Sequence, residues 1–151
     1  MALVRRLGPD DVAGFRAMNA VFSKVFDEPE NYSEKPPAQA YARQWLANPN
    51  HLAIVAEDEG AAVGALAGYI LPKFEQQRSE LYIYDLAVHQ AYRRRGVATA
   101  LIAETRRIAR AVGAWTIFVQ ADTTPEDEAA QALYRKLSSE EISVLHFDIQ
   151  P

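Results

Sequence analysis

The apolar residues near the start of the chain recur with the period of a helix. After Pro9, large apolar side chains return every three or four positions: Val12, Phe15, Met18 and Phe22. Asp10 and Asp11 suit a helix start, because acids interact favourably with the N-terminal end of the helix dipole. The pattern predicts a first helix here, a proline-containing loop over 27–37 and a second helix over 38–47.

Apolar runs in the middle of the chain predict strands. The runs 52–56 and 61–71 flank Glu57-Asp58-Glu59-Gly60, a link rich in turn-forming residues. They therefore predict an antiparallel hairpin. Residues 80–88 are expected to form the next strand.

The second half of the chain predicts alternating helices and strands. Apolar residues at helical spacing over 97–112 end at Gly113, which tolerates the positive φ of a helix end. A buried strand is expected over 115–120, a helix over 125–137 and a closing strand over 142–149. This order of elements predicts a mixed α/β fold.

Composition narrows the class of protein. A length of 151 residues suits a single domain, 1–151, and 49% hydrophobic with 24% charged residues is typical of a globular protein. Cysteine is absent, which excludes disulfides and thiolate ligands and fits a reducing cytoplasm. The start of the chain lacks a signal-peptide pattern, and the run 61–71 is too short to span a bilayer. We therefore expect a cytoplasmic protein with no membrane partner.

The charge pattern favours a small anionic ligand. The formal net charge is −4, whereas nucleic-acid binders usually carry net positive charge, so no nucleic-acid partner is expected. Basic residues gather locally at 93–95 and again at Arg106, Arg107 and Arg110, which suits a compact polyanion. The three histidines show no metal-ligand spacing, and no metal is expected.

The segment 84–101 carries the most informative motif. An apolar strand runs through a basic turn into a helix, and the unpaired backbone N–H groups of a helix start attract anions. Gly96 has no side chain and lets the backbone approach a ligand closely, and the side chain of Ala98 is also small. The alternative is an ordinary strand-to-helix connection with solvated arginines, and a short glycine motif does not decide between the two.

The spacing Arg93-x-x-Gly96-x-Ala98 after this strand resembles the acyl-CoA loop of the GNAT acetyltransferase superfamily. The resemblance implies a mixed, mostly antiparallel central sheet flanked by helices, the acyl-CoA N-acyltransferase (GNAT) fold. It also implies that acetyl-CoA is the co-substrate and that backbone groups bind it. The binding residues are then those of the strand end and the loop: Leu86, Ala87, Val88, Arg93, Arg94, Arg95, Gly96, Val97, Ala98 and Thr99.

The same resemblance implies a proton donor and leaves the base open. Tyr134 lies in a segment similar to the family's tyrosine-bearing helix and would protonate the departing thiolate, although it also fits a packing role on an apolar stripe. Several family members place a carboxylate base on the strand before the loop, where this chain has Tyr82. Glu80, Asp122 and Asp148 are the remaining candidates for the base.

Longer stretches resemble the aminoglycoside 3-N-acetyltransferases of this superfamily, namely 65–76, 78–88, 119–122 and 146–149. This resemblance implies direct transfer of the acetyl group of acetyl-CoA to the 3-amino group of a gentamicin-type aminoglycoside. It also implies antibiotic resistance and a homodimer. Acetylation removes a positive charge from a drug whose target is anionic RNA, which weakens that contact.

An aminoglycoside is a polycation, so its pocket should offer carboxylates and tyrosine hydroxyls. The candidates for substrate binding are Glu28, Glu75, Glu80, Tyr82, Asp122, Asp127 and Asp148. Two alternatives stay open. One is an acetyltransferase for another amine, such as a polyamine or a protein N-terminus, and the other is a non-catalytic acyl-CoA-binding module.

Overall fold

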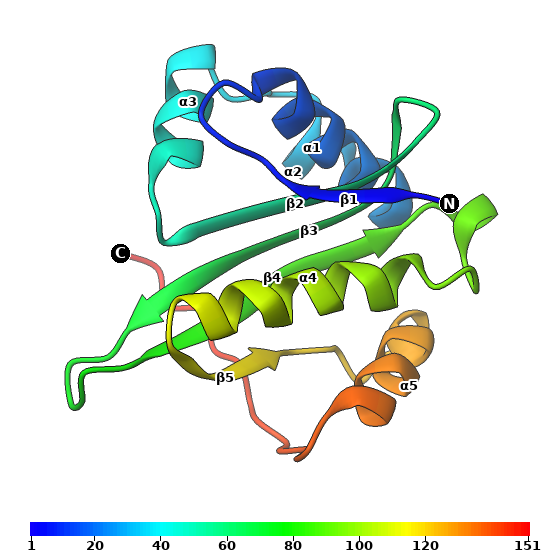
Figure 1. The fold of residues 1–151 in the computed structure, drawn as a ribbon. Helices are drawn as coiled ribbons and strands as arrows, with labels where there is room; N and C mark the ends of the chain where they lie inside the picture. The colour runs from blue at the N-terminus through cyan, green and yellow to red at the C-terminus, as the bar shows by residue number, and fades with distance from the viewer. The chain divides into compact units, whose positions relative to one another are not determined.

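The computed structural model describes residues 1–151, which form two compact units, Met1–Phe118 and Val119–Pro151. The first unit is built on a five-stranded sheet with the strand order β1-β2-β3-β4-β5 (Figure 1). Its strands are β1 Leu3–Arg6, β2 His51–Asp58, β3 Ala61–Pro72, β4 Ser79–Val88 and β5 Ala114–Val119, the last residue of which falls in the second unit. Its helices are α1 Val12–Phe26, α2 Pro29–Tyr32, α3 Gln39–Ala47, the short 3₁₀ helix η1 Gln90–Tyr92, and α4 Val97–Ala111.

Helices cover both faces of this sheet, and strand alternation decides which side chains meet which helix. On one face, Val55 and Ala65 lie in a buried cluster with Phe15 of α1 and with α3. Gly64, one residue before Ala65, faces α4 instead, because a Cβ there would lie 2.8 Å from a methyl group of Val97. Neighbouring strands from β1 to β4 pair antiparallel, so the predicted α/β fold with a mostly antiparallel sheet and flanking helices is confirmed.

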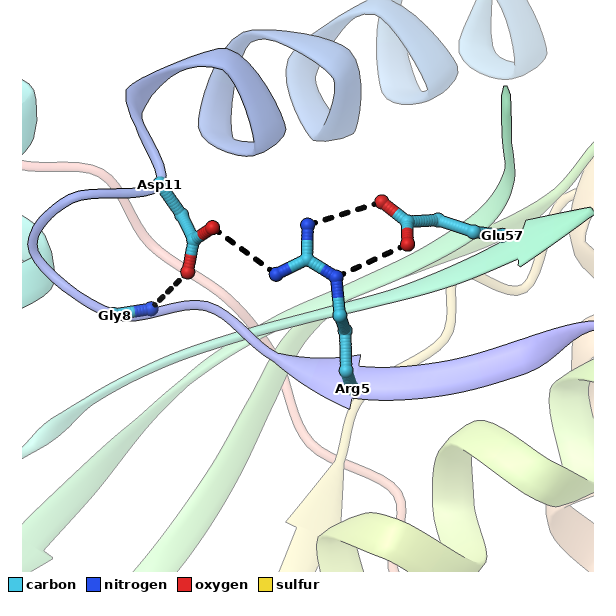
Figure 2. A network of polar contacts seen from close by, with 4 residues as sticks. All are labelled: Arg5, Gly8, Asp11 and Glu57. Atoms are coloured by element: carbon cyan, nitrogen blue, oxygen red, sulfur yellow. Dashed lines mark hydrogen bonds and ion pairs between the residues drawn. The ribbon is translucent and has the colours of Figure 1, made fainter. Parts of the chain in front are cut away.

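An arginine ties the first strand to the first helix and to β2 (Figure 2). The guanidinium of Arg5 donates two hydrogen bonds to the carboxylate of Glu57, at 3.0 and 3.1 Å, and one to Asp11 Oδ1 at 3.1 Å. The backbone N–H of Gly8 donates to Asp11 Oδ2 at 2.8 Å. Two parallel hydrogen bonds between a planar guanidinium and a carboxylate fix the orientation of the two groups as well as the distance between them. The network therefore holds the start of α1 in a defined position relative to β1 and β2.

A β-bulge interrupts the pairing of β3 with β4. Ala67 is paired with Asp85, while the next residue, Gly68, is paired two positions earlier on β4, so Tyr84 is an extra residue. In a regular strand Tyr84 and Asp85 would point to opposite faces, yet both line one pocket. Glycine is required at the bulge, because a Cβ on Gly68 would lie 2.5 Å from the carbonyl oxygen of Tyr82.

The predicted elements of the first unit are confirmed, with two differences. The predicted loop 27–37 contains the short helix α2, which Pro29 starts. The strand predicted at 115–120 is not fully buried, because β5 lies at the edge of the sheet and the side chain of Trp115 is 47% exposed. The guanidinium of Arg78 lies 3.7 Å from the centre of the Trp115 ring and covers it in part.

The second unit contains a 3₁₀ helix, η2 Pro125–Asp127, and α5 Glu128–Leu137, which confirms the predicted helix. The closing strand predicted over 142–149 is wrong, since these residues form no strand and five large apolar side chains are exposed: Ile142, Val144, Leu145, Phe147 and Ile149. An apolar alternation forms a strand only where a neighbouring strand completes its hydrogen bonds, and in the second unit Val119 alone belongs to a strand. A single domain over 1–151 remains a prediction.

Candidate functional site

A pocket of about 240 Å³ lies within the first unit. Its walls come from α1, from the segment around α2, from α3 and from the strands β3 and β4. The bulge of β4 places Tyr84 and Asp85 in the wall together. None of the helices of the chain is long and apolar enough to cross a membrane.

A carboxylate and a phenol form a pair in this pocket. The hydroxyl of Tyr32 donates a hydrogen bond to Asp85 Oδ2 at 2.8 Å. Burial raises the pKa of Asp85, and the charge of Glu28 adds to that rise, while the hydrogen bond from Tyr32 opposes it. Burial and the neighbouring Asp85 also raise the pKa of Tyr32, so its hydroxyl stays protonated and remains a donor.

Aromatic rings form the wall beside this pair. The ring centres of Trp45 and Tyr69 are 6.0 Å apart, and those of Tyr69 and Tyr84 are 5.9 Å apart. The row continues over the sheet through Tyr82, which lies 5.7 Å from Tyr84 and stacks on Phe118 at 4.5 Å. The faces of such rings attract cations, so the wall suits a positively charged group.

The remaining polar groups of the wall are few. Asn19 and Asn31 supply amides, and Lys35 supplies an ammonium group on an exposed residue. Glu28, a predicted substrate-binding residue, accepts a hydrogen bond from Asn31 at 3.1 Å and acts on the pocket through its charge. Asp85 is the one carboxylate among the lining residues.

The predicted anion cradle lies where β4 leads into α4. The backbone turns through the left-handed region twice, with φ of 61° at Arg94 and 79° at Gly96. Such turns direct successive N–H groups to one side, as in anion-binding concavities. No side chain caps the start of α4 and no acid lies in its first turn, so its N–H groups are available to a ligand. A Cβ at Gly96 would meet no protein atom within 4 Å, which leaves open space beside the loop.

The other predicted residues of this segment lie at or beside the cradle. Leu86, Ala87 and Val88 are the last residues of β4. The three arginines 93–95 are exposed, and Val97 is buried and anchors the first turn of α4. This arrangement fits a pyrophosphate bound by backbone N–H groups with arginines nearby.

Two predicted carboxylates lie elsewhere in the first unit. Glu80 forms an ion pair with Lys73 at 3.4 Å, and Glu75 lies 3.7 Å from the same ammonium. Neither lines the pocket. Tyr82, predicted as a substrate-binding residue, lies next to the pocket in the aromatic row rather than in its wall.

The second unit holds the other predicted residues. Tyr134 is a partly buried residue of α5. The backbone N–H of Asp122 donates to Asp127 Oδ2 at 2.8 Å, and the ring of His146 lies 2.8 Å from Asp148 Oδ1. Asp148 lies in an exposed segment without regular structure. In neither unit do three or more His, Cys, Asp or Glu side chains gather to hold a metal ion.

The sequence analysis missed Asp85 and Tyr32. The available signal for Asp85 was a carboxylate placed between apolar and aromatic residues near the end of a strand. The regular alternation of a strand would place the side chains of Asp85 and Tyr84 on opposite faces of the sheet. Only the bulge places both side chains in the wall of one pocket. Tyr32 lies 53 positions earlier in the chain, and no local pattern connects it with Asp85.

Comparison with known proteins gives the following relatives. Residues 18–138 match the acetyltransferase (GNAT) family. The chain is 49% identical to the solved aminoglycoside acetyltransferase HMB0005 from an uncultured soil metagenomic sample, over 100% of this chain and 99% of that one, with a TM-score of 0.97. It is 28% identical to the aminoglycoside acetyltransferase meta-AAC0020, also from an uncultured soil metagenomic sample and solved with sisomicin, over 99% of this chain and 96% of that one, with a TM-score of 0.90.

A curated relative covers less of the chain. The L-2,4-diaminobutyric acid acetyltransferase of Shouchella clausii (strain KSM-K16) is 36% identical over 85 residues, which are 56% of this chain and 45% of that protein. The chain thus spans less than half the length of this curated relative.

Proposed function

Because the chain belongs to the acetyltransferase (GNAT) family, we propose that it transfers the acetyl group of acetyl-CoA to an amine of an aminoglycoside. The observation that carries the proposal is the presence, in one unit, of an uncapped helix start after β4 and a pocket lined by one carboxylate and several aromatic rings. The uncapped helix start suits the phosphates of CoA, and the pocket suits a cationic amine.

The finer proposal is acetylation of the 3-amino group of gentamicin-type drugs. Its support is the resemblance of 65–76 and 78–88 to the 3-N-acetyltransferases and the full-length similarity to an aminoglycoside acetyltransferase. The pocket of about 240 Å³ is slightly smaller than the roughly 300–1,000 Å³ of most small-molecule sites. We therefore expect one ring of the drug to enter it.

The reaction needs a neutral amine, a polarised thioester carbonyl and a proton for the departing thiolate. The backbone amides of Leu86–Val88 would polarise the carbonyl, and those of 94–99 would hold the pyrophosphate. Tyr134 would supply the proton to the thiolate. Fixed backbone groups need little reorganisation during the reaction, which is why they are effective here.

A second candidate is an acetyltransferase for a small diamine. It is favoured by the similarity to the diaminobutyric acid acetyltransferase and by the modest volume of the pocket. A single carboxylate suits the recognition of one ammonium group as well as it suits a ring of a larger polyamine.

A panel of acceptors separates these functions. Release of CoA from acetyl-CoA is measured with gentamicin, sisomicin, diaminobutyrate, spermidine and an N-terminal peptide, and NMR locates the new acetamide. We expect release with the two drugs and an acetamide at the 3-amino nitrogen. Release with diaminobutyrate alone favours the second candidate, and binding of acetyl-CoA without release for any amine identifies a non-catalytic acyl-CoA-binding module.

A further inference from the structure

The residues that line the pocket differ in exposure, and this difference defines a floor and a mouth. Phe15, Met18 and Phe22 of α1 are buried and form the floor. The exposed lining residues form the mouth, and they are Asn31, Lys35, Tyr41 and Tyr84. Since one ring of the drug is expected to enter this pocket of about 240 Å³, the sugars linked to that ring meet the protein at the mouth.

Tyr84 reaches the mouth because of the bulge in β4. It is the extra residue of the bulge, and it is 58% exposed although it belongs to a strand between two others. Its ring centre lies 5.9 Å from that of Tyr69 and 5.7 Å from that of Tyr82, at interplanar angles of 88° and 73°. Two such edge contacts fix the orientation of the ring, and its exposed surface is left for a ligand.

Tyr41 reaches the same mouth from α3. It is also 58% exposed. Burial raises the pKa of Tyr69, a hydrogen bond with Trp45 opposes this rise, and the neighbouring Tyr84 and Tyr41 add to it. Both exposed tyrosines therefore lie close enough to Tyr69 to act on its charge. A strand and a helix thus bring two exposed aromatic rings to one opening.

The mouth has the chemistry of a surface that binds sugar. A pyranose ring has an apolar face of C–H groups and a rim of hydroxyls. Tyrosine offers a rigid apolar ring to that face and a hydroxyl to that rim, and it loses little conformational entropy on binding. Asn31 adds a side-chain amide, whereas the ammonium of Lys35 disfavours a second cation there. The mouth therefore differs from the inner pocket, whose one carboxylate, Asp85, suits an amine.

We propose that Tyr41 and Tyr84 form a sugar-binding subsite at the mouth of the pocket, and that this subsite makes the protein prefer acceptors of two or more rings over a small diamine. This inference rests on the proposed function. The ring that carries the reacting amine enters the pocket, and a linked sugar packs its C–H face on the two tyrosines. The contact removes apolar surface from water, and it does so equally before and during the reaction.

The test compares two acceptors that differ only in the linked sugars. Sisomicin carries them, and 2-deoxystreptamine is its central diamino ring alone. We expect Tyr41→Ala and Tyr84→Ala to raise KM for sisomicin about tenfold with little change in kcat, because the lost binding is the same in the ground and transition states. The constant for 2-deoxystreptamine, measured as a substrate or as a competitor of sisomicin, should stay unchanged.

The matched control is Phe74→Ala, which removes an aromatic side chain that is 99% exposed and lies outside the pocket. It should match the parent with both acceptors. Tyr41→Phe and Tyr84→Phe keep the rings, and KM for sisomicin should stay near the parent value. Alanine suits a helix, so Tyr41→Ala remains informative if Tyr84→Ala disturbs the bulge.

The outcomes separate this inference from the proposed function. Alanine variants that leave KM for sisomicin unchanged, or that weaken both acceptors by the same factor, overturn the subsite. Phenylalanine variants as weak as the alanine variants overturn the role of the ring faces. A central ring that neither reacts nor competes overturns the division into pocket and mouth, whereas a parent inactive with every amine overturns the proposed function.

Discussion

At the scale of single residues, two glycines allow the backbone to adopt the conformation found at the bulge and at the start of α4. Gly68 allows the chain to pass the Tyr82 carbonyl oxygen at the bulge, and Gly96 adopts a positive φ at the start of α4. Gly68 is needed because a Cβ would not fit there, whereas Gly96 is needed because its φ is positive. The two positions are therefore tested by different substitutions.

Gly68→Ala should destabilise the fold and lower activity together. A Cβ 2.5 Å from a backbone oxygen forces the strand to shift, at a cost of about 1–3 kcal/mol in the free energy of unfolding. The shift would also redirect Tyr84 and Asp85. Urea denaturation and turnover measure the two effects. Gly8→Ala is the control, since its nearest contact would be an ordinary 3.8 Å, and a variant at Gly68 as stable as this control would contradict the account of the bulge.

Gly96→Glu should abolish binding of acetyl-CoA while the protein stays folded. The new side chain meets no protein atom near its Cβ but projects a negative charge beside the N–H groups proposed to hold pyrophosphate. Gly113→Glu is the matched control, because Gly113 also has a positive φ, 73°, and open surroundings, yet it follows the other end of α4. Calorimetry compares the two. Equal affinities in both variants would place the cradle elsewhere.

At the scale of elements, the Arg5 network joins β1, β2 and the start of α1 through charged groups that are only partly buried. The hydrogen bond from Gly8, with help from Arg5, lowers the pKa of Asp11 although burial opposes this. A carboxyl with a lowered pKa in the folded state stabilises the fold at pH above its unfolded value of about 3.9. That contribution is lost as pH falls through the folded pKa.

Asp11→Asn should therefore lower the free energy of unfolding by about 1 kcal/mol at neutral pH, a modest value because the pair is partly solvated. The difference from the parent should shrink as pH drops below about 4. Urea denaturation at several pH values measures it, with Asp10→Asn as the exposed control. A difference that is the same at low and neutral pH would show that the charge of Asp11 does not contribute.

At the scale of the whole molecule, the proposed reaction draws on residues from both units. The cradle and the pocket belong to the first unit, and Tyr134 belongs to the second. In the proposed mechanism the binding groups belong to the first unit, and Tyr134, the proposed proton donor, belongs to the second. Substitution of Tyr134 should thus affect turnover and leave binding intact.

Tyr134→Phe should lower kcat on the order of a hundredfold, since it removes only the hydroxyl that is proposed to protonate the thiolate. Affinity for acetyl-CoA should change little. Stopped-flow measurement of the chemical step, alongside calorimetry, separates the two quantities. An unchanged chemical step would leave Tyr134 as a packing residue of α5.

Local sequence by itself determined most of the helices and strands and the position of the turn before α4. The period of apolar residues in α1 and α4 and the runs in β2 and β3 depend on near neighbours, which the sequence displays directly. The loop before α4 was predictable because Gly96 and the start of a helix are local features as well.

Only the tertiary structure decided which residues line the pocket and whether residues 142–149 form a strand. Asp85 meets Tyr32 because a bulge and a short helix bring distant residues together, and neither leaves a period in the sequence. Residues 142–149 have the alternation of a strand but form none, because a strand depends on hydrogen bonds to a neighbour outside itself. Periodicity records the side-chain pattern of a segment, whereas pairing and burial depend on what the rest of the chain places beside it.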